Sequence, residues 1–505
     1  MMAQLRKVLP KNGYHYSQIT EHDSPTHPAS ARRGPGGLWS ERRRRPVIVI
    51  CTAILAILSL VLFFRGPSNG NGCEKQGACR KTSPKLWGQY SPFFSVPSDI
   101  SPAVPSGCEI THVSLLARHG ARYPTEHKSI LYSDLIKRIQ EDVSRYGAGL
   151  EFLQDYEYNL GADQLTFYGE QQLVNMGHDF YQRYQALSDK EDPFIRAAGS
   201  ERVIASAEKF IEGLYKDTGR DEDAAREGIL VVPEEDGYNN TLNHGNCPTF
   251  EDGPSSELSH EKQEVWKQIF VPPIRDRLNA KMPGANLSLD ETIFMMDMCP
   301  FSTVADYHDE KSRFCWLFSE EEWRSYDYFE TLDKWYGYGT GNPLGATQGV
   351  GYVNELIARL TGKSVDDETS TNSTLDGSAE TFPLDRKLYA DFSHDNTMSS
   401  IYATLGLYND TGVMPVNHRL PPVETRGFSA AWTVPFAARM SVEKMRCDAA
   451  PDEEEELVWV LVNDRVVPLT HCAADKLGRC SLGDFVEGLS FARSGGQWDQ
   501  CFRDT

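Results

Sequence analysis

The sequence predicts an α/β fold, because runs with the pattern of buried strands alternate with runs of helical periodicity. In three places a short apolar run leads into a polar turn. These runs cover 110–117, 194–197 and 388–392, and helices over 200–215 and 396–405 follow the last two. No repeat of fixed length is present, which argues against a solenoid. We therefore expect one large α/β domain.

The polar turns after these strands are expected to converge, since ligands of open α/β sheets bind beyond the carboxyl ends of the strands. Two further helical stretches, 130–146 and 166–187, are predicted to form a cap over that crevice. Near the C-terminus, 457–462 and 465–469 flank Asn463-Asp464, a pair typical of a tight hairpin turn.

Composition narrows the class of protein. The chain has 505 residues, of which 40% are hydrophobic and 24% charged, which is typical of a globular protein with one large domain or two. Its net charge of -21 argues against a nucleic-acid partner, because binding phosphate backbones needs a broad basic face. A small anion can still bind in a local basic pocket.

The N-terminal region differs from the rest in charge. Residues 1–45 hold nine Lys or Arg against three Asp or Glu, a balance of +6 that leaves -27 for the remainder. This stretch lacks periodicity, as disordered tails do.

Residues 47–64 carry no charge, and at about 1.5 Å per residue they span most of a hydrocarbon core. We expect a transmembrane helix over 46–65 and a stalk over 66–84.

Charge also sets the expected topology. The arginines 42–45 abut the apolar run, so the positive-inside rule places the tail in the cytoplasm and the rest in the lumen or outside the cell. This is a single-pass signal-anchor arrangement, from which proteolysis could release a secreted form. The alternative is a cleaved signal peptide, whose basic region is normally short. A buried core helix is disfavoured by the four arginines and by the Gly-, Ser- and Asn-rich residues 66–72.

Cysteines and glycosylation sequons agree with an oxidising compartment. Cys51 lies in the apolar run, and an even number remains beyond it, as disulfide pairing requires. None of them forms a C-x-x-C pair, which gives zinc little support. These ten are Cys73, Cys79, Cys108, Cys247, Cys299, Cys315, Cys447, Cys472, Cys480 and Cys501, and the sequons are at Asn239, Asn286, Asn372 and Asn409.

The segment 118–124, Arg-His-Gly-Ala-Arg-Tyr-Pro, directly follows the first predicted strand. Arginine presents a planar fork of donors that matches phosphate oxygens, and Gly120 allows close approach of the backbone. The segment therefore predicts a site for a dianionic group around His119. A surface turn with scattered charges is the alternative, but so fixed a pattern rarely arises by chance.

A second polar segment, Ser393-His394-Asp395-Asn396, follows the strand at 388–392. A His-Asp pair can bind a metal ion, or it can be a hydrogen-bonded pair at the start of a helix. Metal binding needs more carboxylates or imidazoles, and the arginines around His119 would repel a cation. We expect neither a metal ion nor a cofactor.

Together these segments identify a resemblance to the histidine acid phosphatases, and closely to the fungal phytases, which hydrolyse myo-inositol hexakisphosphate (phytate). The resemblance covers residues 85–502, without the tail and anchor. It implies a large α/β sandwich domain with a smaller, mainly helical cap over 125–190 and 215–335. The matching stretches are 86–95, 116–125, 194–213, 336–360, 391–396 and 490–496.

The resemblance also implies a role for each site residue. His119 would attack phosphorus in line to give a phosphohistidine, and Asp395 would protonate the leaving alkoxide. Arg118, Arg122, Arg202 and His394 would hold the phosphate oxygens. The wider substrate pocket would include Gln89, Tyr90 and Lys128. The implied disulfides are Cys73–Cys79, Cys108–Cys447, Cys247–Cys501, Cys299–Cys315 and Cys472–Cys480.

Charge further predicts operation at acid pH. The arginines disfavour an imidazolium, which keeps His119 neutral below its ordinary pKa of about 6.5. Asp395 must begin protonated, and burial and a bound phosphate are expected to raise its pKa. We expect a monomeric phosphate monoester hydrolase that acts on phytate. The alternatives are a broad acid phosphatase, a phosphotransferase of the same superfamily, and a binding ectodomain with a decayed site.

Overall fold

The computed structural model describes residues 83–503, apart from 217, 307–309 and 449–455. The chain divides into two units, 1–79 and 80–505, and every described residue belongs to the second. The expected tail, transmembrane helix, all but the end of the stalk, and the Cys73–Cys79 pair lie outside the described residues. None of the helices in the described part of the chain is both long and apolar enough to cross a membrane.

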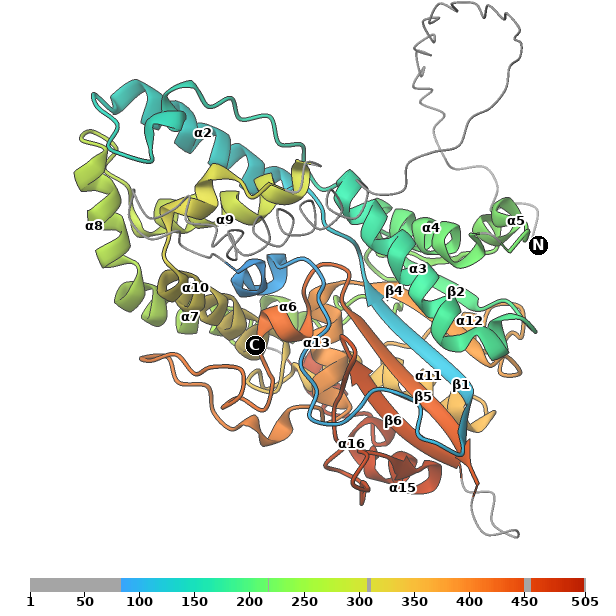
Figure 1. Cartoon of the computed structure of the whole chain (residues 1–505). Helices are drawn as coiled ribbons and strands as arrows, with labels where there is room; N and C mark the ends of the chain where they lie inside the picture. Colours follow the sequence, from blue (N-terminus) through green and yellow to red (C-terminus); the bar gives the residue numbers. More distant parts are fainter. Residues whose placement is uncertain (1–82, 217, 307–309, 449–455, 504–505) are drawn as a thin grey trace, which may run out of the picture. The chain divides into compact units, whose positions relative to one another are not determined.

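An eight-stranded mixed sheet forms the centre of the fold (Figure 1). Its strand order is β3-β2-β4-β1-β5-β6-β7, and β8 pairs with β6. The pairs from β3 to β1 are parallel, whereas β5 to β8 are added antiparallel. The strands are β1 (Cys108–Arg118), β2 (Phe194–Ala198), β3 (Leu230–Val232), β4 (Leu388–Ser393), β5 (Arg439–Cys447), β6 (Glu456–Val462), β7 (Arg465–Val466) and β8 (Cys480–Ser481).

Helices cover both faces of this sheet. Successive residues of a strand point to opposite faces. On β4 the ring of Phe392 packs against Phe210 of α4, and the preceding Asp391 binds Arg359 of α11. Helices α4 and α11 therefore lie on opposite faces. The helices around the sheet include α3 (Phe167–Ser188), α4 (Glu201–Tyr215), α5 (Glu222–Glu227), α11 (Val350–Thr361), α12 (Ser373–Asp376), α13 (Asp395–Thr404), α15 (Leu482–Gly488) and α16 (Ser490–Arg493).

A second group of helices gathers beyond one end of the sheet and forms the cap (Figure 1). Its members are α2 (Glu126–Asp142), α7 (Leu258–Phe270), α8 (Pro272–Lys281), α9 (Leu289–Ala305) and α10 (Glu320–Asp333). The stretch 167–188, expected in the cap, instead packs along α4. Gly177 and Gly213 permit this contact, because a Cβ at Gly213 would lie 1.8 Å from the carbonyl oxygen of Val174.

The predicted strands and the hairpin are confirmed. The strands at 110–117, 194–197 and 388–392 correspond to β1, β2 and β4, and helices α4 and α13 follow the latter two. At the hairpin, Asn463 and Asp464 have φ of 48° and 66°, the left-handed values that a tight turn requires. The short helices and turns that complete the chain are α6 (Pro248–Asp252), α14 (Ala430–Thr433), η1 (Pro84–Leu86), η2 (Gly88–Tyr90), η3 (Glu151–Asp155), η4 (Arg313–Leu317), η5 (Lys334–Tyr338), η6 (Ala346–Gly349), η7 (Asn409–Thr411) and η8 (Trp498–Phe502).

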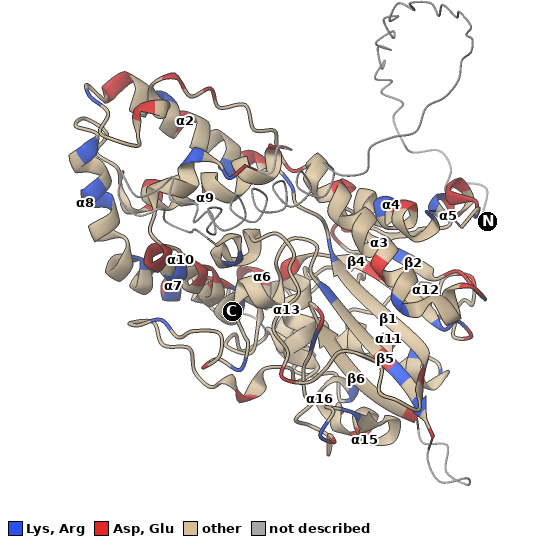
Figure 2. Cartoon of the chain, viewed as in Figure 1, with Lys and Arg blue, Asp and Glu red and all other residues tan. Residues whose placement is uncertain are grey.

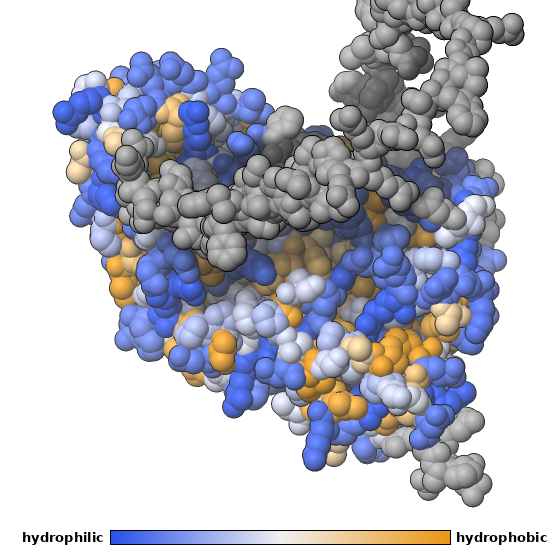
Figure 3. All heavy atoms as spheres, in the orientation of Figure 1, coloured by the Kyte–Doolittle hydropathy of each residue, from blue (hydrophilic) through white to orange (hydrophobic). Residues whose placement is uncertain are grey.

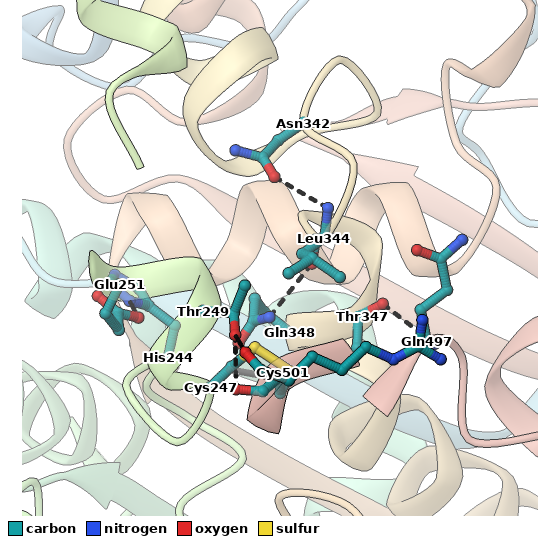
Figure 4. The surroundings of a disulfide bond; sticks show 11 residues. His244, Cys247, Thr249, Glu251, Asn342, Leu344, Thr347, Gln348, Gln497 and Cys501 are labelled. Carbon is teal, nitrogen blue, oxygen red and sulfur yellow. Dashed lines mark hydrogen bonds and ion pairs between the residues drawn. A yellow bond between two sulfur atoms is a disulfide. The ribbon is translucent and has the colours of Figure 1, made fainter. Parts of the chain in front are cut away.

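Four disulfides join the pairs that the resemblance implies: Cys108–Cys447, Cys247–Cys501, Cys299–Cys315 and Cys472–Cys480. The first fastens the start of β1 to the end of β5. The second ties the C-terminal segment to α6, where the Thr249 hydroxyl also donates to the carbonyl of Cys501 (Figure 4). These two bridges join residues that are far apart in the sequence, and bridges of this kind restrict the unfolded chain most.

Hydrophilic side chains dominate the face drawn in Figure 3, with apolar patches mainly in its lower half. The predicted glycosylation residues are accessible to different degrees: Asn239, Asn286 and Asn409 are exposed, and Asn372 is half-buried. The Asn372 side chain also caps α12 by accepting from the backbone of Thr374 at 3.1 Å.

Candidate active site

Three strand ends bring the candidate residues together. β2, β4 and β1 are adjacent and parallel, so the residues that follow them emerge at the same edge of the sheet. His119 follows β1, Arg202 lies in the first turn of α4 after β2, and His394 follows β4. The rings of His119 and His394 have centroids 5.8 Å apart. The predicted convergence of the three turns is confirmed.

The tautomer of His119 is set by its backbone. Its Nδ1 lies 2.8 Å from the carbonyl oxygen of Gly120, which can only accept, so Nδ1 carries the hydrogen. Nε2 therefore holds the lone pair. The ring is almost completely buried, and its own backbone N–H is bonded to the carbonyl of Ser393 on β4. This fixes a nucleophilic nitrogen at the edge of the sheet.

Burial and positive neighbours keep this imidazole neutral. The pKa of His119 is lowered well below 6.5, first by burial and then by the charges of Arg118, Arg122 and Arg202, with His394 adding to them. The arginine effect expected from the sequence is present, but burial is the larger cause. His119 is thus unprotonated in acid solution, as a nucleophile must be.

The three arginines retain donors for a ligand. The Nε atoms of Arg118, Arg122 and Arg202 are buried and have no hydrogen-bond partner among the described residues. Arg118 is anchored by Nη1, which donates to the carbonyls of Gln89 at 2.5 Å and Val434 at 2.7 Å. Because buried donors are costly to leave unpaired and all three arginines act on His119, the arrangement favours an anion bound beside this ring.

Glycine is required at position 120, but for a different reason from the one that the sequence suggested. A Cβ at this position would lie 2.4 Å from the carbonyl oxygen of Gly169 and 2.6 Å from Cδ2 of Leu173. The close approach that requires glycine is thus to the first turns of α3, not to a bound anion. The nearby Ser206 hydroxyl accepts from the Gly120 N–H at 3.1 Å and keeps this loop in place.

Asp395 is held by two cations. Its Oδ2 lies 3.1 Å from Nη2 of Arg118 and 3.2 Å from Nζ of Lys334. Burial raises the pKa of Asp395, as expected, but the charges of Arg118 and Lys334 outweigh it, with smaller contributions from His119 and Arg122. The pKa consequently falls well below its usual range. In the ligand-free protein this carboxyl is therefore ionised, and the raised pKa expected with a bound phosphate stays a prediction.

His394 is held by a carboxylate that the sequence did not indicate. Its Nε2 donates to Oε1 of Glu234 at 2.9 Å. Glu234 also accepts from the Ser200 N–H at 3.0 Å and from its hydroxyl at 2.7 Å, at the start of the helix that carries Arg202. Burial opposes ionisation of Glu234, but these bonds and the charge of His394 lower its pKa to about 2. An ionised Glu234 therefore connects two phosphate-facing elements.

Replacing Glu234 by Ala is expected to lower kcat/KM about 10- to 100-fold, because small displacements of positioned groups are costly to catalysis. Glu234→Gln, which keeps most of the hydrogen bonds, should retain more activity than Glu234→Ala. The neighbouring Glu235 is exposed and provides the matched control Glu235→Ala. Steady-state kinetics on one substrate checks this, and equal losses in the Ala variants of Glu234 and Glu235 would contradict a positioning role.

The other predicted pocket residues form a second polar cluster. Nζ of Lys128 lies 3.2 Å from the hydroxyl of Tyr90 and 3.1 Å from Oδ2 of Asp297. Gln89, whose carbonyl binds Arg118, donates through Nε2 to Glu330 at 2.5 Å. Burial raises the pKa of Glu330 to about 8. The side chain of Lys128 stays about one third exposed, so its charge faces solvent as well as Asp297.

Two site residues, Glu234 and Lys334, were not predicted from the sequence. Glu234 comes two residues after the short strand β3, and the strand-then-polar pattern could have indicated it. Lys334 follows α10 in an irregular turn and gives no such signal; its Nζ donates to Oδ1 of Asn396 at 2.6 Å. Within the part of the chain that is described, no group of three or more His, Cys, Asp or Glu is arranged to hold a metal ion.

Comparison with known families decides the class of protein. A model of the histidine phosphatase superfamily (branch 2) matches residues 109–463. The chain belongs to this superfamily. The match begins in β1 and ends at the hairpin after β6, so it includes all three strand ends of the site. The family resemblance expected from the sequence is confirmed.

Individual relatives of this histidine phosphatase cover most of its length. It is 52% identical over 424 residues to phytase A of Emericella nidulans, which spans 83% of this chain and 90% of that protein. It is 49% identical over 439 residues to phytase A of Arthroderma benhamiae, spanning 86% and 94%. The crystal structure of the phytase from D. castellii has the same fold, with a TM-score of 0.67, 21% identity and coverage of 83% and 88%.

Proposed function

We propose that this histidine phosphatase hydrolyses phytate to lower inositol phosphates and phosphate through a phosphohistidine at His119. The observation that carries the chemistry is a neutral, buried His119 surrounded by three arginines with unpaired donors. The substrate follows from relatives named phytase A that are about half identical over most of the chain.

In the first step Nε2 of His119 attacks phosphorus in line with the departing inositol oxygen. Charge on the transferring phosphoryl group spreads over three oxygens, which the Nε donors of Arg118, Arg122 and Arg202 are placed to stabilise. His394, held in place by Glu234, lies beside His119 and joins them in binding the phosphate. Water then attacks the phosphohistidine, releases phosphate and restores His119.

Asp395 supplies the proton for the leaving oxygen. Inositol alkoxide is a poor leaving group, so protonation in the transition state lowers the barrier substantially. In the free enzyme this carboxyl is ionised by Arg118 and Lys334. A phosphate that engages Arg118 removes part of that stabilisation and adds negative charge nearby, which raises the pKa of Asp395. The acid is therefore created by substrate binding.

Proton uptake should accompany anion binding for this reason. We expect binding of myo-inositol hexasulfate at the active site, where the sulfates do not titrate at acid pH, to take up at most one proton in the range between the pKa of the free and of the bound Asp395. Between the pKa of the free state and that of the bound state the affinity should fall with rising pH, because the ligand-free carboxyl must gain a proton there, and above the pKa of the bound state it should level off. Calorimetry in buffers of different ionisation enthalpy measures this. Unchanged uptake in Asp395→Asn would refute the assignment.

Phytate preference is tested by comparing substrates on the purified protein. The exposed part of Lys128, with Tyr90 and Gln89 beside it, is placed to contact further phosphates of a multiply phosphorylated ring. We expect kcat/KM for phytate to exceed that for aryl and sugar phosphates across acid pH, and Lys128→Gln to reduce this preference. Equal kcat/KM values for all substrates would indicate a broad acid phosphatase and not a phytase.

We further propose that the chain is a single-pass membrane protein whose enzymatic domain is luminal or extracellular. The uncharged run 47–64, the arginines 42–45 and the four disulfides support this topology. Extraction of membranes at alkaline pH, followed by protease and glycosidase treatment, tests it. Recovery of the full-length, unglycosylated chain in the soluble fraction would overturn it.

A further inference from the structure

A large cavity of about 1090 Å³ lies at the end of the sheet opposite to the active site. Its wall includes the start of β1, from Glu109 to His112, and Arg446 near the end of β5, which pairs with Glu109. His112 lies on β1 and His119 directly follows this strand, seven residues further on, a separation of about 23 Å in an extended chain. The cavity is therefore separate from the site described above.

The wall of this cavity is strongly basic in a chain of net charge -21. Nine of its residues are Lys or Arg, and three are acidic (Glu109, Glu456 and Glu487). Figure 2 shows basic residues at this end of the sheet, beyond the start of β1. The acidic run 452–455 lies outside the described residues. The basic residues are Arg183, Lys190, Arg359, Lys363, Arg386, Lys387, Lys444, Arg446 and Arg493.

Some of these cations already form ion pairs with carboxylates of the protein. Arg183 binds Glu443 at 2.7 Å, Arg359 binds Asp391 at 2.6 Å, and Lys444 binds Glu456 at 2.9 Å. By contrast, five exposed side chains of the wall make no ion pair with any described residue. These five are Lys190, Lys363, Arg386, Lys387 and Arg493.

The floor of the cavity contributes a further donor. Arg359 is 3% exposed, and its Nε has no hydrogen-bond partner among the described residues. His112, 4% exposed, lies beside it on β1, and burial, with the charges of Lys444 and Arg359, lowers its pKa to about 3. A buried unpaired donor is costly unless a ligand or water accepts from it.

We propose that this cavity is a second anion site, which binds a small molecule carrying several phosphate or sulfate groups. A single phosphate cannot pair with five cations from four segments, whereas a ring or short chain bearing several such groups can. At about 1090 Å³ the cavity is slightly larger than typical small-molecule sites, which measure about 300–1,000 Å³, so a molecule bearing several such groups fits in it. A long nucleic acid is disfavoured, since a chain of net charge -21 repels an extended polyanion. The site is independent of the proposed reaction.

Calorimetry with myo-inositol hexasulfate on the whole protein at low salt tests this inference. We expect two sites per wild-type chain. The triple variant Lys363→Gln, Arg386→Gln, Lys387→Gln should retain the active-site event and lose at least about tenfold in affinity at the second. The matched control removes three exposed cations elsewhere, Arg145→Gln, Lys216→Gln and Lys476→Gln, and should keep both sites. A single site in the wild-type protein, or equal losses in both triple variants, would overturn the proposal.

The two binding events can be told apart. Arg122→Gln should weaken only the event at the active site, so failure of the proposed function would leave the second event intact. Hydrogen–deuterium exchange of the wild-type protein gives a readout that does not depend on folded variants. The ligand should protect backbone amides in 186–190, 359–363 and 384–388. Protection confined to the segments around His119 and His394 would also overturn the proposal.

Discussion

Replacing His119 by Ala is expected to reduce hydrolysis of every phosphate monoester by at least about 10⁴-fold, because the covalent route disappears with its nucleophile. The arginines would still bind phosphate, so KM should change far less than kcat. Acid-quench experiments with labelled substrate provide a direct measurement: the wild-type protein should carry acid-labile phosphate, and His119→Ala should carry none.

Loss of folding would give the same absence of activity, so the variant needs a structural control. The imidazole is buried and bonds to Gly120, which means that His119→Ala removes packing as well as chemistry. Thermal unfolding reports whether the variant is folded, and the active-site event in calorimetric binding of inositol hexasulfate, the one that Arg122→Gln weakens, reports whether the site survives. A folded His119→Ala protein that still formed a phosphoenzyme would place the nucleophile elsewhere.

The sequence was sufficient to predict those site residues that come directly after strands in the chain. His119, Arg202 and His394 come after apolar runs at the ends of parallel strands, and the topology of an α/β sheet brings such positions together. The local pattern therefore carried information about distant contacts. The four described disulfides were likewise accessible, but only through family resemblance, since spacing cannot select a pairing.

Other features depend on tertiary contacts that no local pattern encodes. Lys334 lies in η5, directly after α10, and reaches Asp395 from there; its charge helps to hold the pKa of Asp395 low in the ligand-free protein, which the sequence did not indicate. The stretch 167–188 has the amphipathic pattern of a cap helix, yet small residues at Gly177 and Gly213 let it pack on α4. In both cases a contact with a residue distant in the sequence, and not the local sequence pattern, determines the structure.

Asp395→Asn is expected to lower kcat on phytate by about 10²- to 10⁴-fold, the usual contribution of a general acid. Substrate binding should not weaken, because the variant removes a negative charge that opposes phosphate in the free site. Asp333 offers a matched control, since it also pairs with Lys334, at 3.0 Å, and has no ion pair with Arg118. Asp333→Asn should therefore retain most of the activity that Asp395→Asn loses.

The dependence on the leaving group separates the loss of an acid from a general disturbance of the site. An inositol alkoxide must be protonated as it departs, whereas a nitrophenolate is stable as an anion and gains little from a proton donor. Asp395→Asn should consequently lose far more activity on phytate than on p-nitrophenyl phosphate. A displaced arginine or histidine would slow both substrates alike, because each forms the same phosphohistidine. Equal losses on the two substrates would thus assign Asp395 to positioning Arg118 and not to proton transfer.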